Sequence, residues 1–537
     1  MEGVDLGPRG RHRTRIRWDQ IDSRWEAPVS YRNVFASLRV RNQADGATEA
    51  GTPTPDFNMH RLISWSLTGL LACGPALSLQ AASKPLALDR VRIVDLEAGR
   101  SGEAQCVRIE QGRIARIASA GSRACLGGAT VVPLDGRYLM PGLIDMHAHL
   151  TLGPLEVRRE GEEVIIQALP DDAIADHNAA RLVGFGITTI RNPAGDLAAA
   201  MRYRMRRAEG AVVGPESFDA GKVLNDVDLP GLGTGVRTVD DVRQAVAAQV
   251  DAGADWIKLY TGLTPELLQA GIDAAHGHDR PAVAHLEDVA WTDALPMGLD
   301  GIVHLMPVSP DLLAPQDVEA YREARRPGTF GFFEWWERFD PEGAEADRMV
   351  AAFDRYRPVF DATLVAFHAA FVQDQADSPY LDEARRYAHP RLFENWTSFF
   401  TFAIGWESED FARARAVWPK VQRMAVRLYA SNARMTIGTD MSNPRIAPGV
   451  SFHREMRLLA DAGVPTSRIL AAATWQAADA LGVGDRLGRV AIGYEADLLV
   501  LDDNPREDLA HAREAHAVVV DGRYLDSAAL ATLRGDE

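Results

Sequence analysis

The chain has 537 residues, of which 46% are hydrophobic and 25% charged, a composition typical of globular proteins and unlike that of fibrous or disordered ones. This length suits one large domain with a smaller satellite, or three ordinary domains. The formal net charge of −17 argues against nucleic acid or an anionic membrane surface as a partner, because binding phosphate groups requires a basic face.

The first 83 residues differ in character from the rest. Residues 1–58 lack apolar periodicity and are rich in Arg, Gly, Thr and Pro, so we expect disorder there. Residues 59–83 combine a basic start, an apolar run from Leu62 to Ala72 and a small-residue exit, which is the pattern of a secretory signal. Because a signal normally stands first, we expect translation to begin at Met59 and residues 1–58 not to be translated.

The signal allows two forms of an exported protein. Leu70-Leu71-Ala72-Cys73 is similar to a bacterial lipobox, which predicts an outer-membrane lipoprotein tethered to the membrane through a lipidated Cys73. Cleavage near Ala81 would instead release a soluble periplasmic protein. Cys106 and Cys125 then remain as a pair in an oxidising compartment, where they either form a disulfide across a hairpin or stay two independent buried thiols.

Short β-rich runs flank a long middle section. Four of them lie between Leu86 and Leu139, and two more lie at Gly493–Leu501 and Ala517–Gly522. We interpret residues 84–140 and 484–537 as the two parts of one small β-sandwich domain built from both termini.

In residues 141–483, apolar strands alternate with amphipathic helices, which is the sequence sign of a parallel α/β architecture. The expected strands are the run that opens at Pro141, Gly186–Arg191, a weaker candidate at Ser217–Val223, Ala254–Tyr260, Pro281–His285, Gly301–His304, Ala362–Ala366 and Met435–Asp440. This is the number of strands that a (β/α)8 TIM-like barrel requires.

An insertion at about residues 310–432 lengthens the barrel beyond what its loops and helices need. It is rich in aromatic residues: Phe330, Phe332, Phe333, Trp335, Trp336, Phe399, Phe402 and Trp406. We interpret it as a lid or pocket wall for an apolar substrate group. A dimer surface, which would make the protein a homo-oligomer, and ordinary core are the alternatives.

Six polar residues stand at or near the carboxyl ends of the expected strands, where a barrel builds its active site. They are His147, His149, Lys258, His285, His304 and Asp440. Histidines spaced two apart in a strand project from one side, which suits zinc or another divalent transition metal. His276-Gly277-His278 repeats this spacing in a segment typical of a solvated turn, so we treat that pair as a decoy.

Lys258 is the unusual member of this set. Four histidines and an aspartate are ordinary zinc ligands, but a protonated lysine has no acceptor and cannot coordinate a cation. We therefore expect Lys258 to be neutral, or to be modified by CO2 into a carbamate whose two oxygens bridge two metals. The alternative is an ordinary ion pair with an acid.

Through these residues the chain resembles the amidohydrolase superfamily, most closely its imidazolonepropionase- and prolidase-like branch. The resemblance runs from about Leu86 to Leu509, and its motifs are Pro141–His149, Gly184–Thr189, Ala252–Lys258, Ile437–Asp440 and the tail from Ala471 to Gly488. It implies two divalent transition metals, with zinc favoured. In that arrangement His147, His149 and Asp440 hold one metal, His285 and His304 hold the other, and a carboxylated Lys258 bridges them.

The resemblance also implies a mechanism. A metal-bound hydroxide attacks the substrate carbonyl, and Asp440 acts as general base and proton shuttle. Tyr260, on the same strand face as Lys258, is a candidate hydrogen-bond donor to the developing oxyanion, with a packed rim tyrosine as the alternative. The expected activity is hydrolysis of amide bonds in small-molecule substrates, namely dipeptides or N-acyl amino acids.

Two other functions compete with this hypothesis. The same site could hydrolyse a lactone or a phosphotriester or deaminate an aromatic ring, although Lys258 counts against the usual single-metal deaminase. A catalytically inactive relative that serves as a binding or scaffold protein is the second rival, and the retention of every ligand counts against it. The runs after His285 and His304, and the run Arg191–Asp196, depart from the usual family pattern and leave the substrate contacts open.

Overall fold

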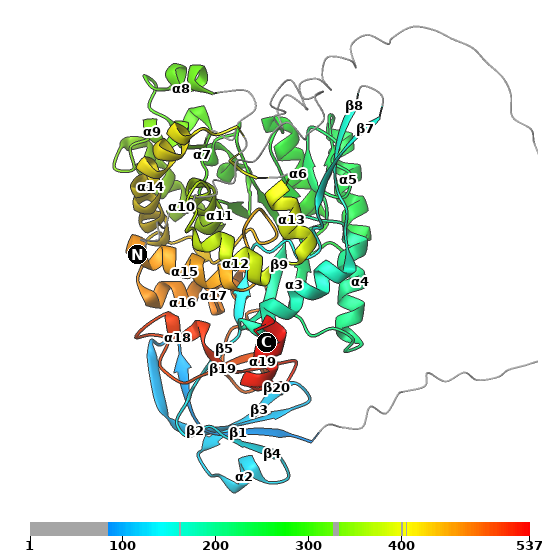
Figure 1. Ribbon diagram of the computed structural model, residues 1–537, viewed down its shortest axis with the longest axis vertical. Coiled ribbons are helices and arrows are strands. Elements are labelled where there is room, and N and C mark those ends of the chain that lie inside the picture. Colours follow the sequence, from blue (N-terminus) through cyan, green and yellow to red (C-terminus); the bar gives the residue numbers. More distant parts are fainter. Residues whose placement is uncertain (1–83, 161–162, 326–331, 399–400, 404, 537) are drawn as a thin grey trace, which may run out of the picture.

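The computed structural model describes residues 84–160, 163–325, 332–398, 401–403 and 405–536 (Figure 1). The disorder predicted for residues 1–58 and the signal predicted for residues 59–83, with the lipobox at Cys73, lie outside this part of the chain. Among the residues that are described, no helix is both long and apolar enough to pass through a bilayer.

Strands from both ends of the chain form one eight-stranded mixed sheet. Its order is β20-β19-β18-β5-β1-β2-β3, with β4 paired to β1. The strands are β1 (Leu86–Asp95), β2 (Arg100–Glu110), β3 (Arg113–Ser119), β4 (Thr130–Pro133), β5 (Tyr138–Pro141), β18 (Leu498–Leu501), β19 (Ala515–Val520) and β20 (Arg523–Leu525). The ends meet where β18 pairs antiparallel with β5, with Leu499 opposite Met140.

This sheet has an apolar core of its own. Leu88, Val107 and Leu139 from the first part pack with Leu498 and Val519 from the second, and each is fully buried. Because the cluster needs side chains from both ends, neither end can bury its apolar face alone. The construction from both termini is therefore as expected, whereas the division into two sandwich layers stays a prediction.

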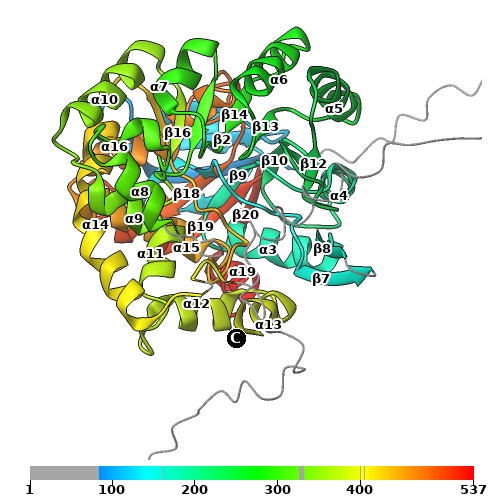
Figure 2. The same cartoon turned by 90° about the horizontal axis from the view of Figure 1, so that it is seen from above.

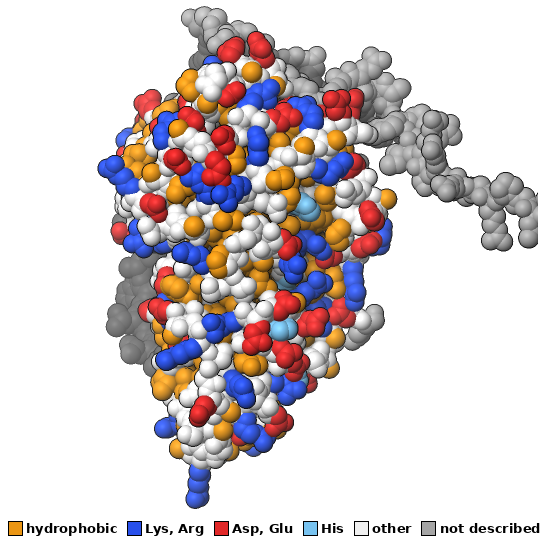
Figure 3. Space-filling model, turned by 90° about the vertical axis from the view of Figure 1, so that its left-hand side faces the viewer, with side chains coloured by type: hydrophobic (Ala, Val, Ile, Leu, Met, Phe, Trp, Pro, Cys, Tyr) orange, Lys and Arg blue, Asp and Glu red, His pale blue; other side chains and the backbone are white. Residues whose placement is uncertain are grey.

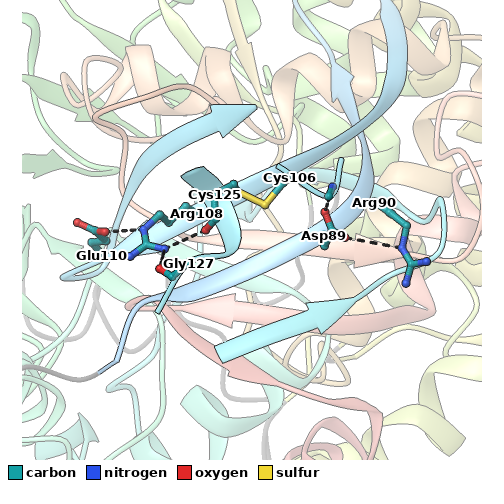
Figure 4. The surroundings of a disulfide bond; sticks show 8 residues. Asp89, Arg90, Cys106, Arg108, Glu110, Cys125 and Gly127 are labelled. Atoms are coloured by element: carbon teal, nitrogen blue, oxygen red, sulfur yellow. Dashed lines mark hydrogen bonds and ion pairs between the residues drawn. A yellow bond between two sulfur atoms is a disulfide. The ribbon is translucent and has the colours of Figure 1, made fainter. Parts of the chain in front are cut away.

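A disulfide joins the N-terminal part of this sheet to a short helix (Figure 4). It joins Cys106 of β2 to Cys125 of the short helix α2 (Arg123–Leu126), with the two Cα atoms 6.3 Å apart. Arg108 supports the same turn, since its Nη1 donates to the backbone oxygens of Cys125 and Gly127, each at 2.9 Å. The bridge therefore links β2 to the helix that follows the β2–β3 hairpin and does not cross the hairpin itself.

The middle of the chain is α/β, with parallel strands inside a layer of helices (Figure 2). One sheet has the order β10-β9-β6 and the other β12-β11-β13-β14-β15-β16-β17. The strands are β6 (Leu143–Asp145), β9 (Ile187–Asn192), β10 (Glu216–Asp219), β11 (Val223–Asn225), β12 (Gly233–Gly235), β13 (Ile257–Leu259), β14 (Ala282–Ala284), β15 (Gly301–Val303), β16 (Val359–Asp361) and β17 (Arg434–Thr436).

Beyond their last residues, β6 and β17 also run side by side. The amide of Met146 donates to the oxygen of Ile437 at 2.8 Å, and Ala148 forms a parallel bridge with Met441. The α/β class is thus confirmed, and the two sheets approach each other where the predicted ligands lie. A single closed eight-stranded barrel is not what the sheets themselves show, so it stays a prediction.

Helices follow the strands, and several begin at side-chain caps. Thr238 and Asp241 form a capping box at the start of α5, and Thr264 caps α6, whose first residue is Pro265. The helices of the α/β unit are α3 (Asp172–Gly184), α4 (Leu197–Ala208), α5 (Val239–Asp251), α6 (Pro265–Gly277), α7 (Trp291–Ala294), α15 (Val450–Ala462), α16 (Thr466–Ala472) and α17 (Trp475–Ala480). A hairpin of β7 (Leu155–Glu160) and β8 (Glu163–Ala168) stands at one end of the molecule, and α18 (Ala510–Arg513) and α19 (Ser527–Arg534) belong to the C-terminal part.

The segment predicted as an insertion is largely helical. It contains α8 (Val318–Ala324), α9 (Phe332–Arg338), α10 (Ala344–Tyr356), α11 (Leu364–Phe371), α12 (Pro379–Tyr387), α13 (Pro390–Ser398) and α14 (Ser408–Tyr429). Phe333, Trp335 and Trp336 are almost completely buried, which favours core packing for these three. Phe330 and Phe399 lie outside the described residues.

One predicted strand in this segment is wrong. Residues 362–366 were expected to be a strand, but the strand β16 ends at Asp361 and the helix α11 begins at Leu364. Thr363 between them has φ +46°, which turns the chain out of the sheet. The short apolar run Leu364–Phe371 is therefore a buried helix, which composition alone does not distinguish from a strand.

Ion pairs attach the insertion helices to each other. Nε and Nη2 of Arg413 on α14 donate to the Glu337 carboxylate on α9, at 2.7 and 2.8 Å. Lys420 donates to the backbone oxygens of Trp336, Glu337 and Phe339 at the end of α9. The face that carries these helices mixes acidic and basic side chains (Figure 3), as expected of a solvated surface.

Candidate metal centre

His147, His149 and Asp440 converge beyond the ends of β6 and β17. Their ligand atoms all lie within 4.8 Å of one another, and all three side chains are buried. Nε2 of His149 lies 2.9 Å from Oδ1 of Asp440, and Nε2 of His147 lies 3.3 Å from the same oxygen. Two imidazole nitrogens and a carboxylate oxygen thus face one point, which is the donor set that a divalent transition metal prefers.

Asp145 holds the two ligand-bearing loops together. Its Oδ1 accepts hydrogen bonds from the amides of His147 at 3.0 Å and Thr439 at 3.2 Å, and its Oδ2 accepts one from the Thr439 hydroxyl at 2.7 Å. Burial raises the pKa of Asp145 to about 7, against these hydrogen bonds, which favour the carboxylate. This residue is the aspartate of the Asp-Met-His-Ala-His motif, so one short sequence supplies both the ligands and their support.

His285 and His304 stand directly after β14 and β15. The ring of His304 lies 4.6 Å from that of His147, and the ring of His285 lies 4.8 Å from that of His304. Nδ1 of His304 is 2.8 Å from the Thr363 hydroxyl, whereas neither ring nitrogen of His285 has a hydrogen-bond partner in the described part of the chain. Burial lowers the pKa of both histidines, which keeps the neutral form that binds metals.

Lys258 lies inside β13, with 2% of its surface exposed, and its Nζ has no hydrogen-bond partner among the described residues. Burial lowers the pKa of Lys258 to about 7, an effect that Asp361 opposes and Arg191 reinforces. Its charge also lowers the pKa of His285 and His304, so it lies close enough to act on both. A buried lysine that is easily neutral and lacks a partner does not behave like half of an ion pair.

The backbone at the site is unusual. His304, Asp440 and Thr363 have φ angles of +66°, +63° and +46°, the left-handed region that residues other than glycine rarely adopt. Such conformations each cost on the order of 1–3 kcal/mol and persist where the surrounding structure imposes them. Their clustering around two predicted ligands is typical of a functional site.

Sequence reasoning missed Asp361 and Arg191. Oδ1 of Asp361 lies 2.9 Å from Nδ1 of His147, and its Oδ2 accepts a hydrogen bond from Nη2 of Arg191 at 2.6 Å. Arg191 also donates through Nε to the backbone oxygen of Met146 at 2.8 Å. Burial raises the pKa of Asp361 to about 6, although the neighbouring guanidinium favours the carboxylate. Asp361 is the last residue of β16, and the predicted ligands likewise lie at or near the carboxyl ends of their strands. A correct prediction of this strand would therefore have identified Asp361 as a site residue.

Other candidate residues lie outside this cluster or at its edge. The Tyr260 ring meets that of His285 edge to face, with centroids 4.8 Å apart. His276 and His278 are exposed at the end of α6, where Nε2 of His276 contacts Asp300 at 2.8 Å, so the decoy interpretation fits the structure. His368 and His453 are held elsewhere, by the hydroxyl of Tyr380 and the backbone oxygen of Phe185.

Residues of this kind fit a metal. The partnerless nitrogens of His285 and Lys258 are buried polar atoms, which proteins satisfy almost without exception. Asp361 orients His147 through the ring nitrogen that does not face Asp440, as outer partners of metal-bound histidines do. The cluster therefore has both the donors and the supporting contacts of a metal centre.

Comparison with known proteins agrees with this chemistry. The model of the amidohydrolase family matches residues 365–525. Imidazolonepropionase from Stenotrophomonas maltophilia (strain R551-3) is 24% identical over 437 residues, which are 79% of this chain and 92% of that protein.

Solved structures have the same fold. A Xaa-Pro dipeptidase with bound methionine has a TM-score of 0.60 at 19% identity, covering 82% of this chain and 100% of its own. Bottromycin amidohydrolase has a TM-score of 0.59 at 23% identity, covering 83% and 88%. Fold and donor set together resemble those of metal-dependent hydrolases. The chain is similar to the amidohydrolase superfamily, and its resemblance to the imidazolonepropionase- and prolidase-like branch is confirmed.

Proposed function

We propose that this chain is a binuclear metal-dependent hydrolase that cleaves the amide bond of dipeptides or N-acyl amino acids. As an amidohydrolase it is a hydrolase that acts on carbon–nitrogen bonds. The observation that carries the finer proposal is Lys258, which is buried within reach of His285 and His304 and has no hydrogen-bond partner in the described part of the chain. A site for one metal needs no such lysine, whereas a lysine carbamate supplies two oxygens to two metals.

In this proposal the residues divide the work. His147, His149 and Asp440 would hold one metal, His285 and His304 would hold the other, and carboxylated Lys258 would contribute to both sites. When bound, the metals, with zinc favoured, would act as Lewis acids that lower the pKa of a water molecule and polarise the scissile carbonyl. Asp440 takes the proton of the attacking water and delivers it to the leaving amine. Nε2 of His149 lies 2.9 Å from the Asp440 carboxylate, close enough for both to bind the same metal, and Tyr260 beside His285 is the candidate donor to the oxyanion.

Arg445 supports a substrate that carries a free carboxylate. It lies five residues after Asp440, is half-buried and donates from Nη1 to the backbone oxygen of Gln373 at 3.0 Å. Burial lowers the pKa of Arg445, and no acidic side chain among the described residues offsets that shift. A guanidinium without an acid is suited to binding a carboxylate in bidentate fashion. Dipeptides and N-acyl amino acids carry such a group, whereas lactones and phosphotriesters lack it.

Two structural expectations belong to the same proposal. Eight of the ten parallel strands would close into a (β/α)8 barrel with about residues 310–432 inserted, and the strands from both termini would form a small β-sandwich. Export to the periplasm, as a soluble protein or as a lipoprotein anchored through Cys73, is supported by the disulfide of Cys106 and Cys125, since such bonds persist in oxidising compartments.

A substrate screen tests the activity. Protein that starts after Ser83 is loaded with zinc and CO2 and assayed on dipeptides, N-acyl amino acids, lactones and phosphotriesters. We expect amide hydrolysis, with about two metals per chain, and loss of turnover in Asp440→Asn with the fold retained. A metal-free, inert protein would favour the scaffold alternative, and near-normal turnover in Asp440→Asn would remove Asp440 as the base.

The carboxylate is tested with matched substrate pairs. Each active amide is assayed with a free carboxylate and as its carboxamide, in the wild type, in Arg445→Met and in the control Arg434→Met. Arg434 is an exposed arginine that begins β17, at the end of the strand away from Asp440. We expect a preference for the carboxylate that Arg445→Met removes and Arg434→Met keeps. An equal rate on both members of each pair in the wild type would refute this role.

A further inference from the structure

The helix α11 is capped in an unusual way. Its N-cap residue, Thr363, makes no hydrogen bond to the first turn of the helix. The first amides are instead bound by Glu455 of α15, whose Oε1 accepts from Leu364 at 3.0 Å and whose Oε2 accepts from Val365 at 2.6 Å. The carboxylate is completely buried. A helix start that most proteins satisfy with a local side chain is satisfied here from 90 residues away.

Several helices, among them α12 at Ser378 and α17 at Thr474, have no side-chain cap. Five others use the ordinary solution. Their N-cap side chains accept hydrogen bonds from amides two or three residues further on, as in Asp171 of α3, Asp196 of α4, Thr238 of α5, Thr264 of α6 and Asp526 of α19. Thr363 is a residue type that caps well, so its failure to cap α11 needs a reason.

The reason is that its hydroxyl is already used. Oγ1 of Thr363 lies 2.8 Å from Nδ1 of His304, and both side chains are buried. A contact at Nδ1 leaves Nε2 of His304 free to bind a metal, and it fixes the direction of the ring. Thr363 reaches this position with φ +46°, a strained conformation that must be held from outside.

We propose that Glu455 is a positioning residue for the metal ligand His304: it takes over the capping of α11 and so frees Thr363 to orient the imidazole. This inference rests on the proposed function in one respect, that His304 binds a metal. Glu455 touches neither metal nor substrate, so it acts only through Thr363.

The free-energy cost of burying the Glu455 carboxylate supports a functional role for it. Burial raises the pKa of Glu455 to about 8, and Asp361 and Asp145 push it in the same direction, while the two amides favour the carboxylate. A short polar side chain at the N-cap would close the helix without a buried carboxylate. The cap with the higher energetic cost, a buried carboxylate, stands at the helix whose N-cap hydroxyl contacts His304.

The variant Glu455→Gln separates positioning from simple stability. A glutamine keeps the size of the side chain but accepts from only one of the two amides and presents its own NH2 to the other. We expect metal affinity, measured by chelator competition, to fall about 10- to 100-fold, as for other outer partners of metal ligands. The absorption spectrum of the cobalt-loaded protein should change because the His304 ring moves.

The matched control is Glu383→Gln. Glu383 on α12 is also largely buried and accepts two hydrogen bonds, from Nε and Nη2 of Arg454 at 3.0 and 2.5 Å, but it binds no amide of α11. Because Arg454 precedes Glu455 on α15, this control shows whether losing any carboxylate contact of α15 is enough to disturb the site. It should lower stability and leave metal affinity and the cobalt spectrum unchanged. Thr363→Val, which keeps the Glu455 contacts, provides a second route if Glu455→Gln does not fold, and it should weaken metal binding to a similar degree.

The outcomes are distinct. Wild-type metal affinity and cobalt spectrum in either folded variant, Glu455→Gln or Thr363→Val, would overturn the positioning role and leave the proposed function intact. A wild-type protein that binds no metal would overturn both. Loss of affinity in both variants with the control unaffected would establish the role.

Discussion

Among residues that are not themselves predicted ligands, Asp361 is the one whose substitution should lower stability and metal affinity most. Asp361→Asn keeps the shape of the side chain, but an amide can accept from only one of its two partners, Arg191 at 2.6 Å and His147 at 2.9 Å. Both Asp361 and Arg191 are fully buried, so the variant leaves an unpaired guanidinium in the core. Removing one partner of a buried ion pair costs about 3–5 kcal/mol. Losing the outer contact to a metal-bound histidine weakens metal binding about 10- to 100-fold.

The assay is urea unfolding of the metal-free protein together with chelator competition on the loaded one. Asp374→Asn is the control, because Asp374 pairs with Arg415 at 2.6 Å but both side chains are about one-third exposed. An ion pair of that kind contributes at most about 1 kcal/mol. If Asp361→Asn unfolds like the control and binds metal like the wild type, the buried pair does not support His147 and the reasoning fails.

Two further predictions concern the terminal sheet. Burial raises the pKa of Asp497 to about 7 from 3.8, so its contribution to stability is complete below pH 3.8 and is lost as the pH rises through 7. We therefore expect the unfolding free energy of Asp497→Asn, measured in urea, to rise relative to that of the wild type between pH 5 and pH 8. The full pKa shift corresponds to at most about 4 kcal/mol. An equal difference between the two proteins at both pH values would contradict this. The double variant Cys106→Ser, Cys125→Ser opens a loop of 19 residues, which should lower the unfolding free energy by about 3 kcal/mol. Its turnover should stay normal, because both cysteines lie beside the terminal sheet, at the end of the molecule away from the α/β unit that carries the predicted ligands (Figure 1), and a loss of activity in folded protein would show that the two parts are coupled.

The predicted histidine ligands could be proposed from the sequence because each follows a short, strongly apolar run. His285 and His304 come directly after three-residue strands, and parallel strands bring their carboxyl ends to one edge. Asp361 ends a strand of the same length. Because the helix α11 that follows begins with apolar residues, the strand was predicted too late, at residues 362–366. A correct rule applied to a wrong boundary therefore hid this residue.

Contacts between segments that are distant in the sequence could not be predicted from sequence patterns. Glu455 on α15 lies on a helix whose amphipathic pattern explains its burial but not its partner, which is 90 residues away. The pairing of β18 with β5 was inferred only as a shared domain, since register depends on side chains from both ends. Local propensity predicts elements, whereas these contacts depend on how the elements meet.

The sheet that joins both ends of the chain has a consequence for synthesis. β5 ends at residue 141 and its partner β18 begins at residue 498, so one edge of β5 has no neighbour until nearly the whole protein has been made. At about 5–20 residues per second, this interval is roughly 20–70 s. An open strand edge invites pairing with other chains during that time. A ribosome-bound intermediate would therefore need a holding chaperone until its last segment emerges.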